Sequence, residues 1–232
     1  MTLLNTSLIR KLTLFLAAAM LSVSAMAADF NQTQRLANQG DIDAQYMLGL
    51  MYAKGEGVRQ DSTKAVQWFE KSANQGDANA QALLGMMYYG GEGVRQDYIQ
   101  AAQWTKKASS QGNAIAQYYL GKMYYEGKGV RQNDSQAAQW FEKSANQGDM
   151  DAQFIIGSMY YQGKGVRQNY SQAAQWFEKS ANQDNASAQF IIGSMYHQGI
   201  GVRKNMSIAK EWYGKACDIG NQEGCDGYRI LN

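Results

Sequence analysis

Proline is absent from the 232 residues, whereas glycine occurs 24 times. Turns in this chain must therefore be built from glycine and from the local hydrogen bonds of Asn and Asp. Histidine occurs once and cysteine only twice, so the spacing that a bound metal needs is missing. The sequence predicts no metal site and no cofactor.

Net charge is also nearly lacking. The chain has 22 basic and 20 acidic residues, and its first 27 residues hold Arg10 and Lys11 but no acid. The remainder is therefore neutral, with 20 residues of each sign. Nucleic-acid binding favours a clearly basic chain, so we expect no nucleic-acid partner.

A long apolar run is found only near the N-terminus. It extends from Leu12 to about Val23, after two basic residues and before the small residues of Ala25-Met26-Ala27. This order is typical of a secretory signal peptide, and the run is short for a membrane span. We expect residues 1–27 to be cleaved near Ala27. The mature chain would then be periplasmic or secreted and without a membrane span.

The rest of the chain repeats itself every 36 residues. Each copy has Ala-Gln near its start, then Met-Tyr, then Gly-x-Gly-Val-Arg, and finally an alanine and a tryptophan. Such self-similarity is the signature of a repeat architecture. The five copies are residues 41–76, 77–112, 113–148, 149–184 and 185–220.

Two helices are expected in each copy. In the first copy the residues Ala44, Met47, Leu48, Met51 and Tyr52 have the spacing of one helical face. The second half of the copy gives the same spacing with Ala65, Trp68 and Phe69, and Gly55 and Gly57 separate the halves. We therefore expect helix, seven-residue glycine loop, helix, with all five tryptophans in the core: Trp68, Trp104, Trp140, Trp176 and Trp212.

Particular residues predict how these helices begin, pack and end. Asp or Asn precedes each second helix as an N-cap, and glutamine follows three residues later in three copies, like a capping box. Gly49 and its equivalents lie in mid-helix, which implies close approach of another helix. Asp184 replaces the glycine that ends the other second helices, so its turn is expected to be strained or differently shaped.

Two helices cannot bury both of their apolar faces, so neighbouring copies must stack. We therefore predict an all-α fold, an αα-superhelix (α-solenoid) of five helix-loop-helix repeats. Residues 28–40 resemble the end of a second helix and are predicted to form an N-terminal half-repeat cap. Residues 221–232 are predicted to form a C-terminal capping helix.

The pattern Leu48-Gly49-x-x-Tyr52 with Ala65-x-x-x-Phe69 resembles the tetratricopeptide signature. The interval between its halves is longer, and the late proline is missing. The longer glycine loop, the 36-residue period and the added tryptophan resemble the Sel-one-like repeat family. This resemblance covers nearly the whole mature chain. It implies an αα-superhelix that binds other proteins, and it implies no particular ligand.

The two cysteines, Cys217 and Cys225, lie on either side of a turn at Gly220. An even pair in a secreted chain suggests a disulfide. Secreted members of the resembled family carry cysteines at the same separation, which supports this pairing.

Enzymatic activity is the main alternative, because some secreted relatives in that family bind or hydrolyse β-lactams. Ser207-Ile208-Ala209-Lys210 matches the Ser-x-x-Lys motif of such enzymes. Ser207 also occupies an ordinary helix-start position, and no Lys-Thr-Gly partner motif exists. His197 stands where three other copies have tyrosine, at residues 89, 125 and 161. We therefore expect no catalytic residues, with an enzyme that binds β-lactams or cell-wall muropeptides as the alternative.

Two surfaces are candidates for binding. In the tetratricopeptide geometry the first helices line a concave face, which we expect to bind a protein or peptide. The same aromatic rings could instead seal adjacent repeats, and both interpretations stay open. The predicted residues are Tyr46, Tyr89, Tyr118, Tyr125, Phe154, Tyr161, Phe190 and His197.

The second surface is a ladder of arginines in the glycine loops. These arginines could clamp an acidic partner, or they could bond loop carbonyls and acids of adjacent repeats. Their nearly constant surroundings favour the structural role. They are Arg59, Arg95, Arg131, Arg167 and Arg203.

Overall fold

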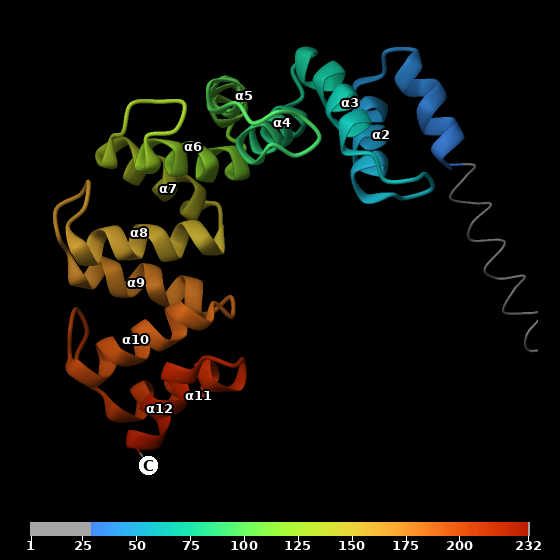
Figure 1. Ribbon diagram of the computed structural model, residues 1–232. Coiled ribbons are helices and arrows are strands. Elements are labelled where there is room, and N and C mark those ends of the chain that lie inside the picture. Colours follow the sequence, from blue (N-terminus) through green and yellow to red (C-terminus); the bar gives the residue numbers. More distant parts are fainter. Residues whose placement is uncertain (1–28, 232) are drawn as a thin grey trace, which may run out of the picture. The chain divides into compact units, whose positions relative to one another are not determined.

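The computed structural model of the protein describes residues 29–231, and within them every regular element is a helix (Figure 1). The predicted all-α repeat fold is confirmed. The predicted signal peptide lies outside the described residues. No helix in residues 29–231 is long and apolar enough to cross a membrane.

Residues 29–38 are helical and precede five pairs of helices and a last single helix. These are α2 (Ile42–Lys54), α3 (Ser62–Asn74), α4 (Ala78–Gly90), α5 (Tyr98–Ser110), α6 (Ala114–Glu126), α7 (Asp134–Asn146), α8 (Met150–Gln162), α9 (Tyr170–Ala181), α10 (Ala186–Gln198), α11 (Met206–Asp218) and α12 (Gln222–Ile230).

The chain divides into two compact units, the first ending at Asp97 and the second beginning at Tyr98. In the first unit α3 packs against both α2 and α4. In the second unit each helix from α6 to α11 packs against the helices before and after it, and α12 packs on α11 and α10. Each unit therefore has the neighbour-to-neighbour contacts of a solenoid.

The second helices begin at Asp or Asn N-caps, as the sequence predicts. In α7 the Asn133 side chain accepts a hydrogen bond from the Gln136 amide, and Asp61, Asn169 and Asn205 do the same in α3, α9 and α11. The amide of Asn133 itself donates to the carbonyl of Tyr124, at 2.9 Å. In a capping box the glutamine side chain would accept the hydrogen bond from this amide. Here the Tyr124 carbonyl accepts it instead.

The mid-helix glycines make room for the large ring of the second helix. A Cβ added at Gly49 would lie 2.5 Å from the ring of Phe69, and one at Gly121 would lie 2.9 Å from the ring of Phe141. The rings of Phe177 and Tyr213 occupy the same position beside Gly157 and Gly193. The predicted close approach is confirmed, and these second-helix rings fill the core.

The prediction that all five tryptophans lie in the core is wrong for three of them. Trp176 and Trp212 are buried, whereas Trp68, Trp104 and Trp140 are half-buried. A lysine three residues later covers each ring, as Lys143 covers Trp140 with its Nζ 4.0 Å from the ring centroid. The residue directly after the tryptophan, such as Phe69 or Phe141, is buried in the core instead, because it faces the glycine of the first helix.

The turn at Asp184 differs from its equivalents, as expected. Its φ of 63° is the only positive value among non-glycine residues in the described range, whereas Gly148 in the same place has φ 97°. A left-handed conformation strains a residue that has a Cβ. Asp184 Oδ1 also accepts a hydrogen bond from Gln189 Nε2, at 3.4 Å.

A ladder of buried glutamines ties successive turns together. Gln117 Oε1 accepts a hydrogen bond from Gln147 Nε2 at 2.8 Å, and Gln45 with Gln75 and Gln153 with Gln183 repeat this bond. Gln189 is the last of the buried glutamines, and Ile219 stands where its donor would be. Its Oε1 is buried without a hydrogen-bond partner among the described residues.

Changing Ile219 to glutamine is expected to stabilise the protein by about 1 kcal/mol, because a donor would reach the unpaired oxygen of Gln189. The melting temperature should rise by roughly 2–4 °C in a thermal scan. Ile219→Asn is the matched control, since it removes the same exposed apolar side chain but its amide is one methylene too short to reach Gln189. Equal melting of both variants would contradict this interpretation of the ladder.

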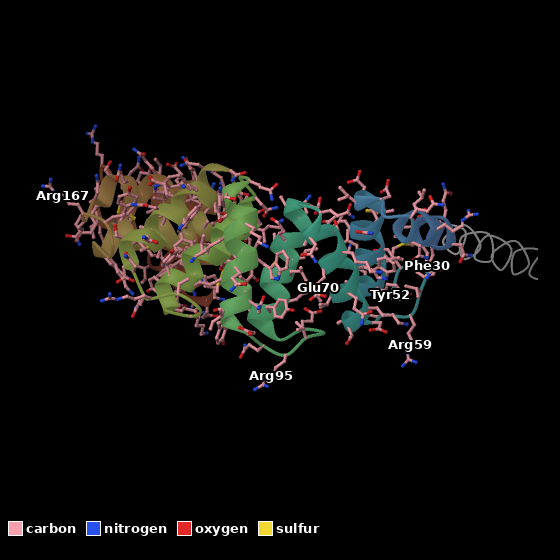
Figure 2. All side chains as sticks on the ribbon, turned by 90° about the horizontal axis from the view of Figure 1, so that it is seen from above. Phe30, Tyr52, Arg59, Glu70, Arg95 and Arg167 are labelled. Atoms are coloured by element: carbon pink, nitrogen blue, oxygen red, sulfur yellow. A yellow bond between two sulfur atoms is a disulfide. The ribbon has the colours of Figure 1, made fainter. Side chains whose placement is uncertain are left out.

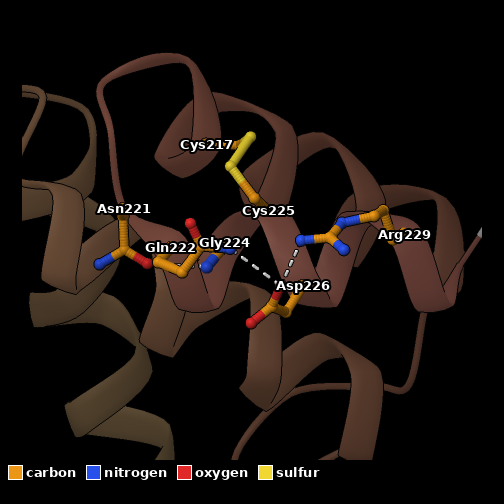
Figure 3. The surroundings of a disulfide bond; sticks show 7 residues. All are labelled: Cys217, Asn221, Gln222, Gly224, Cys225, Asp226 and Arg229. Atoms are coloured by element: carbon orange, nitrogen blue, oxygen red, sulfur yellow. Dashed lines mark hydrogen bonds and ion pairs between the residues drawn. A yellow bond between two sulfur atoms is a disulfide. The ribbon is translucent and has the colours of Figure 1, made fainter.

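The predicted disulfide joins Cys217 near the end of α11 to Cys225 in α12, with the Cα atoms 4.5 Å apart (Figure 3). The Asn221 side chain caps α12 by accepting from the Gly224 amide at 2.7 Å. Closing so short a loop contributes about 2.5 kcal/mol by the chain-entropy estimate. The bond fastens α12 to the end of the second unit.

Candidate functional site

The candidate site lies on one face of α6, α8 and α10 in the second unit, which we call the first-helix face. It contains the predicted residues Tyr118, Tyr125, Phe154, Tyr161, Phe190 and His197, all of them half-buried. Tyr46 and Tyr89 are half-buried at the equivalent positions of the first unit.

Between α6 and α8 the first-helix face holds a depression of about 230 Å³. Tyr118, Lys122 and Tyr125 of α6 line one side, and Ile155 and Ser158 of α8 line the other. The core ring of Phe141 also lines it. An apolar hollow bordered by charged groups therefore opens between these two repeats.

The next pair of first helices repeats this arrangement. Between α8 and α10 a depression of about 280 Å³ is lined by Tyr161, Phe190, Ile191 and Ser194 among others. Ser158 and Gln162 of α8 border both depressions. Two hollows with a common wall therefore follow each other along the face, at equivalent positions of successive repeats.

The first column of aromatic residues both packs and remains partly accessible. Tyr118 lies 5.8 Å from Phe141 between ring centroids, and Phe154 lies 5.7 Å from Phe177. The rings of Tyr46 and Phe190 contact the core rings of their own repeats in the same way. Burial raises the pKa of Tyr118 to about 12, and the carboxylates of Asp151 and Asp149 add to the rise. Its hydroxyl therefore stays protonated and able to donate a hydrogen bond.

The second column contacts residues from neighbouring elements. Lys164 Nζ, from the next glycine loop, lies 3.7 Å from the ring centroid of Tyr125. The rings of Tyr161 and Tyr170 meet edge to face at 5.1 Å, and His197 lies 6.3 Å from Tyr213. Hydrogen bonding to Tyr125 raises the pKa of Lys164, so this lysine is charged at neutral pH. Tyr125 thus links two repeats.

The polar groups differ between the two depressions. Beside the α6–α8 depression Glu126 pairs with Lys122 at 4.0 Å and with Lys128 at 2.8 Å. Beside the α8–α10 depression the groups are neutral, and Gln198 Nε2 donates to Ser194 Oγ at 2.8 Å. The face therefore changes from charged to uncharged along the unit.

Sequence reasoning missed Ile155 and Ile191, which line the depressions. They are the equivalents of Met47, which the helical spacing placed in the core and which is 49% exposed. The helical spacing did contain a sign of this role, because the position lies at the margin of the apolar stripe of the first helix. Only the packing decides whether such a marginal residue turns inward or lines a surface hollow.

Comparison with known proteins agrees with these repeats. The Sel1 repeat family profile matches residues 42–77, 78–113, 114–149, 151–185 and 186–221. The chain belongs to the Sel1 repeat family. Its repeats are of a type that mediates protein–protein interactions. No curated protein matches the chain.

Several solved structures resemble this Sel1 repeat protein. The protective antigen c5321 of uropathogenic Escherichia coli is 35% identical, with a TM-score of 0.84 over 87% of this chain and 43% of the other. A Sel1 repeat protein from Oxalobacter formigenes is also 35% identical, with a TM-score of 0.80 over 88% and 59%. A protein from Klebsiella pneumoniae described as a putative Sel1 repeat protein is 27% identical, with a TM-score of 0.55 over 87% and 98%. The chain therefore spans about half the length of the first two.

The candidate catalytic residues are not arranged as a nucleophile with its base. Ser207 and Lys210 border one open depression of about 540 Å³, but no hydrogen bond joins them in the described structure. Lys210 Nζ instead lies over the ring of Tyr228, 5.3 Å from its centroid. An activated serine needs a base within hydrogen-bond reach. In residues 29–231 no group of three or more His, Cys, Asp or Glu residues could hold a metal ion.

The arginines of the glycine loops do not have the structural role that the sequence favours. All five are exposed, and none has a hydrogen-bond or ion-pair partner among residues 29–231. Arg59, Arg95 and Arg167 project away from the ribbon in Figure 2. The loop conformation rests on its glycines, and the guanidinium groups remain available.

Proposed function

We propose that this Sel1 repeat protein is a periplasmic or secreted scaffold that binds an extended peptide segment of a partner protein. The binding site is the first-helix face of the second unit. The observation that carries the proposal is the pair of neighbouring depressions between α6, α8 and α10 with their common wall. Successive repeats offer successive hollows, which suits a linear ligand.

The chemistry of the face supports a peptide. Half-buried aromatic rings supply apolar contact area at little entropic cost, and such anchors dominate binding energies. Ser158 and Gln162 lie between the hollows, where their polar groups can bond a peptide backbone. A muropeptide from the cell wall is the alternative ligand, because it also combines amides with small side chains.

The location outside the cytoplasm rests on separate observations. The Cys217–Cys225 disulfide is typical of oxidising compartments. The relative from uropathogenic E. coli is described as a protective antigen, which fits exposure to a host. The leader expected at residues 1–27 would direct export.

Changing Ser158 to tryptophan is expected to weaken partner binding by roughly tenfold or more, because the new ring would enter both hollows. Tyr161→Ala should cost about 1–2 kcal/mol of binding. The partner is first captured from the envelope fraction and identified by mass spectrometry. Its affinity for each variant is then measured by calorimetry.

Gln139→Trp is the matched control, because it adds the same ring to an exposed position of α7. It should bind like the unchanged protein, and all variants should give the same helical circular dichroism. A partner that binds Ser158→Trp normally would place the site elsewhere. Competition by purified muropeptides but not by peptides would favour the alternative ligand.

A further inference from the structure

Charge is unevenly divided between the two units, although residues 28–232 are neutral as a whole. Residues 28–97 contain nine acidic and six basic residues, a net charge of −3. Residues 98–232 contain eleven acidic and fourteen basic residues, a net charge of +3. The second unit is therefore the cationic part of the chain.

Much of this difference lies in the glycine loops. In the first unit the second loop residue is Glu56 or Glu92, whereas in the second unit it is Lys128, Lys164 or Ile200. The last loop residue changes in the same way, from aspartate at 61 and 97 to asparagine at 133, 169 and 205. Loops 127–133, 163–169 and 199–205 of the second unit, here called the basic loop edge, therefore contain no acidic residue.

The packing places these loops in a row. A Cβ at Gly165 would overlap the carbonyl oxygen of Asp134, which begins the second helix of the preceding repeat. Gly201 contacts the Tyr170 carbonyl in the same way. Each loop thus sits directly on the repeat before it, and loops 163–169 and 199–205 follow each other at the left of the second unit in Figure 1.

Four cations of the basic loop edge are unpaired in the described structure. Lys128 is neutralised by Glu126 at 2.8 Å, and Lys164 lies 3.7 Å from Asp134. The unpaired cations are Arg131, Arg167, Arg203 and Lys204, all exposed. Arg203 and Lys204 also border an open depression of about 520 Å³ with Asn205 and Tyr196.

We propose that the basic loop edge binds an acidic segment of a polypeptide in extended conformation. Guanidinium groups pair with carboxylates through two parallel hydrogen bonds. An extended chain in the polyproline II conformation has three residues per turn, so carboxylates at every third residue lie along one face of it. The basic loop edge likewise presents one arginine per repeat along one row. This surface is separate from the first-helix face and does not depend on the function proposed for it.

An anionic membrane fits this edge less well, because membrane binding also needs apolar side chains that insert. Tyr170 and Met206 are the large exposed apolar side chains directly after these loops, and each stands alone at its own loop. The ring of Tyr170 is held in place, because it packs against Tyr161 and its hydroxyl accepts a hydrogen bond from Gln168. The charges form a line of single arginines, which suits a linear ligand.

The test measures binding of a labelled peptide with glutamate at every third position and serine between, by fluorescence anisotropy at low salt. The double variant Arg167→Gln/Arg203→Gln is expected to weaken binding about fivefold to tenfold, as the loss of exposed ion pairs implies. The difference should shrink as salt is raised. Arg59→Gln/Arg95→Gln is the matched control, with the same residues and loop positions in the first unit, and should change binding less than twofold.

A second peptide contains the same glutamates clustered at one end, and it should bind more weakly than the spaced one. Equal loss in both arginine pairs would overturn the proposal. Binding to phosphatidylglycerol vesicles or to a sulfated polysaccharide without binding to the spaced peptide would also overturn it, in favour of those anions.

Discussion

Replacing Phe141 by alanine is expected to lower the free energy of unfolding by about 3–5 kcal/mol, the cost of emptying a buried aromatic site. Phe141 is 1% exposed, and its ring fills the space that Gly121 leaves open on α6. It also contacts Tyr118, so the loss would loosen the floor of the α6–α8 depression. Urea denaturation followed by circular dichroism measures the change.

Trp140→Ala, at the adjacent position, is the control. Trp140 is half-buried, and one of its ring faces is covered by Lys143 rather than by the core. Its loss should cost about 1 kcal/mol, the typical effect of a point mutation outside the core. If Trp140→Ala proved as damaging as Phe141→Ala, the core assignment of the two rings would be wrong.

This contrast shows what the sequence could and could not determine about the core. The 36-residue period and the helical spacing were enough to predict both helices of each repeat, and Gly49 predicted their close contact. Trp68 and Phe69 are adjacent, and both fit the apolar stripe of the second helix. Only the position of the first-helix glycine decides which ring goes inward, and that depends on how the two helices cross.

The candidate site could be predicted only in part. Helical register placed Tyr118, Tyr125, Tyr161 and Phe190 on the first-helix face, and these residues do line the two depressions. Whether they act as anchors or as packing was open in the sequence. In the structure Tyr118 and Phe190 contact core rings, Tyr125 and Tyr161 pack against the edges of the core, and all four stay partly accessible. Surface hollows arise from side-chain shape, which a periodicity does not contain.

The arginines of the glycine loops are a case in which the sequence favoured a structural bond that the described structure lacks. Constant surroundings in five repeats suggested that each guanidinium has a structural bond. A repeat can also remain constant because its glycines fix the loop, with the arginine simply carried along. The unpaired arginines and the change from Glu56 and Glu92 to Lys128 and Lys164 together identify the basic loop edge.

Changing Gly165 to alanine is expected to lower the free energy of unfolding by about 2–5 kcal/mol. Gly165 has φ 72°, a left-handed conformation that costs a residue with a Cβ about 1–2 kcal/mol. In addition, the new Cβ would overlap the carbonyl oxygen of Asp134, a backbone atom that cannot turn aside. Overpacking of this kind typically costs about 1–3 kcal/mol more. Urea denaturation of the full chain measures the loss.

Gly163→Ala is the control that separates the steric cost from the conformational cost. Gly163 has φ 71°, nearly the same backbone conformation, but its nearest contact for a new Cβ is the Gln168 side chain at 3.1 Å. It should therefore cost only the conformational part, about 1–2 kcal/mol. Because Gly165 seats its loop on the preceding repeat, Gly165→Ala should also displace Arg167 and weaken the spaced acidic peptide more than Gly163→Ala does. Equal stability of the two variants would mean that the loops are not stacked through this glycine, and the regular arginine spacing would lose its structural basis.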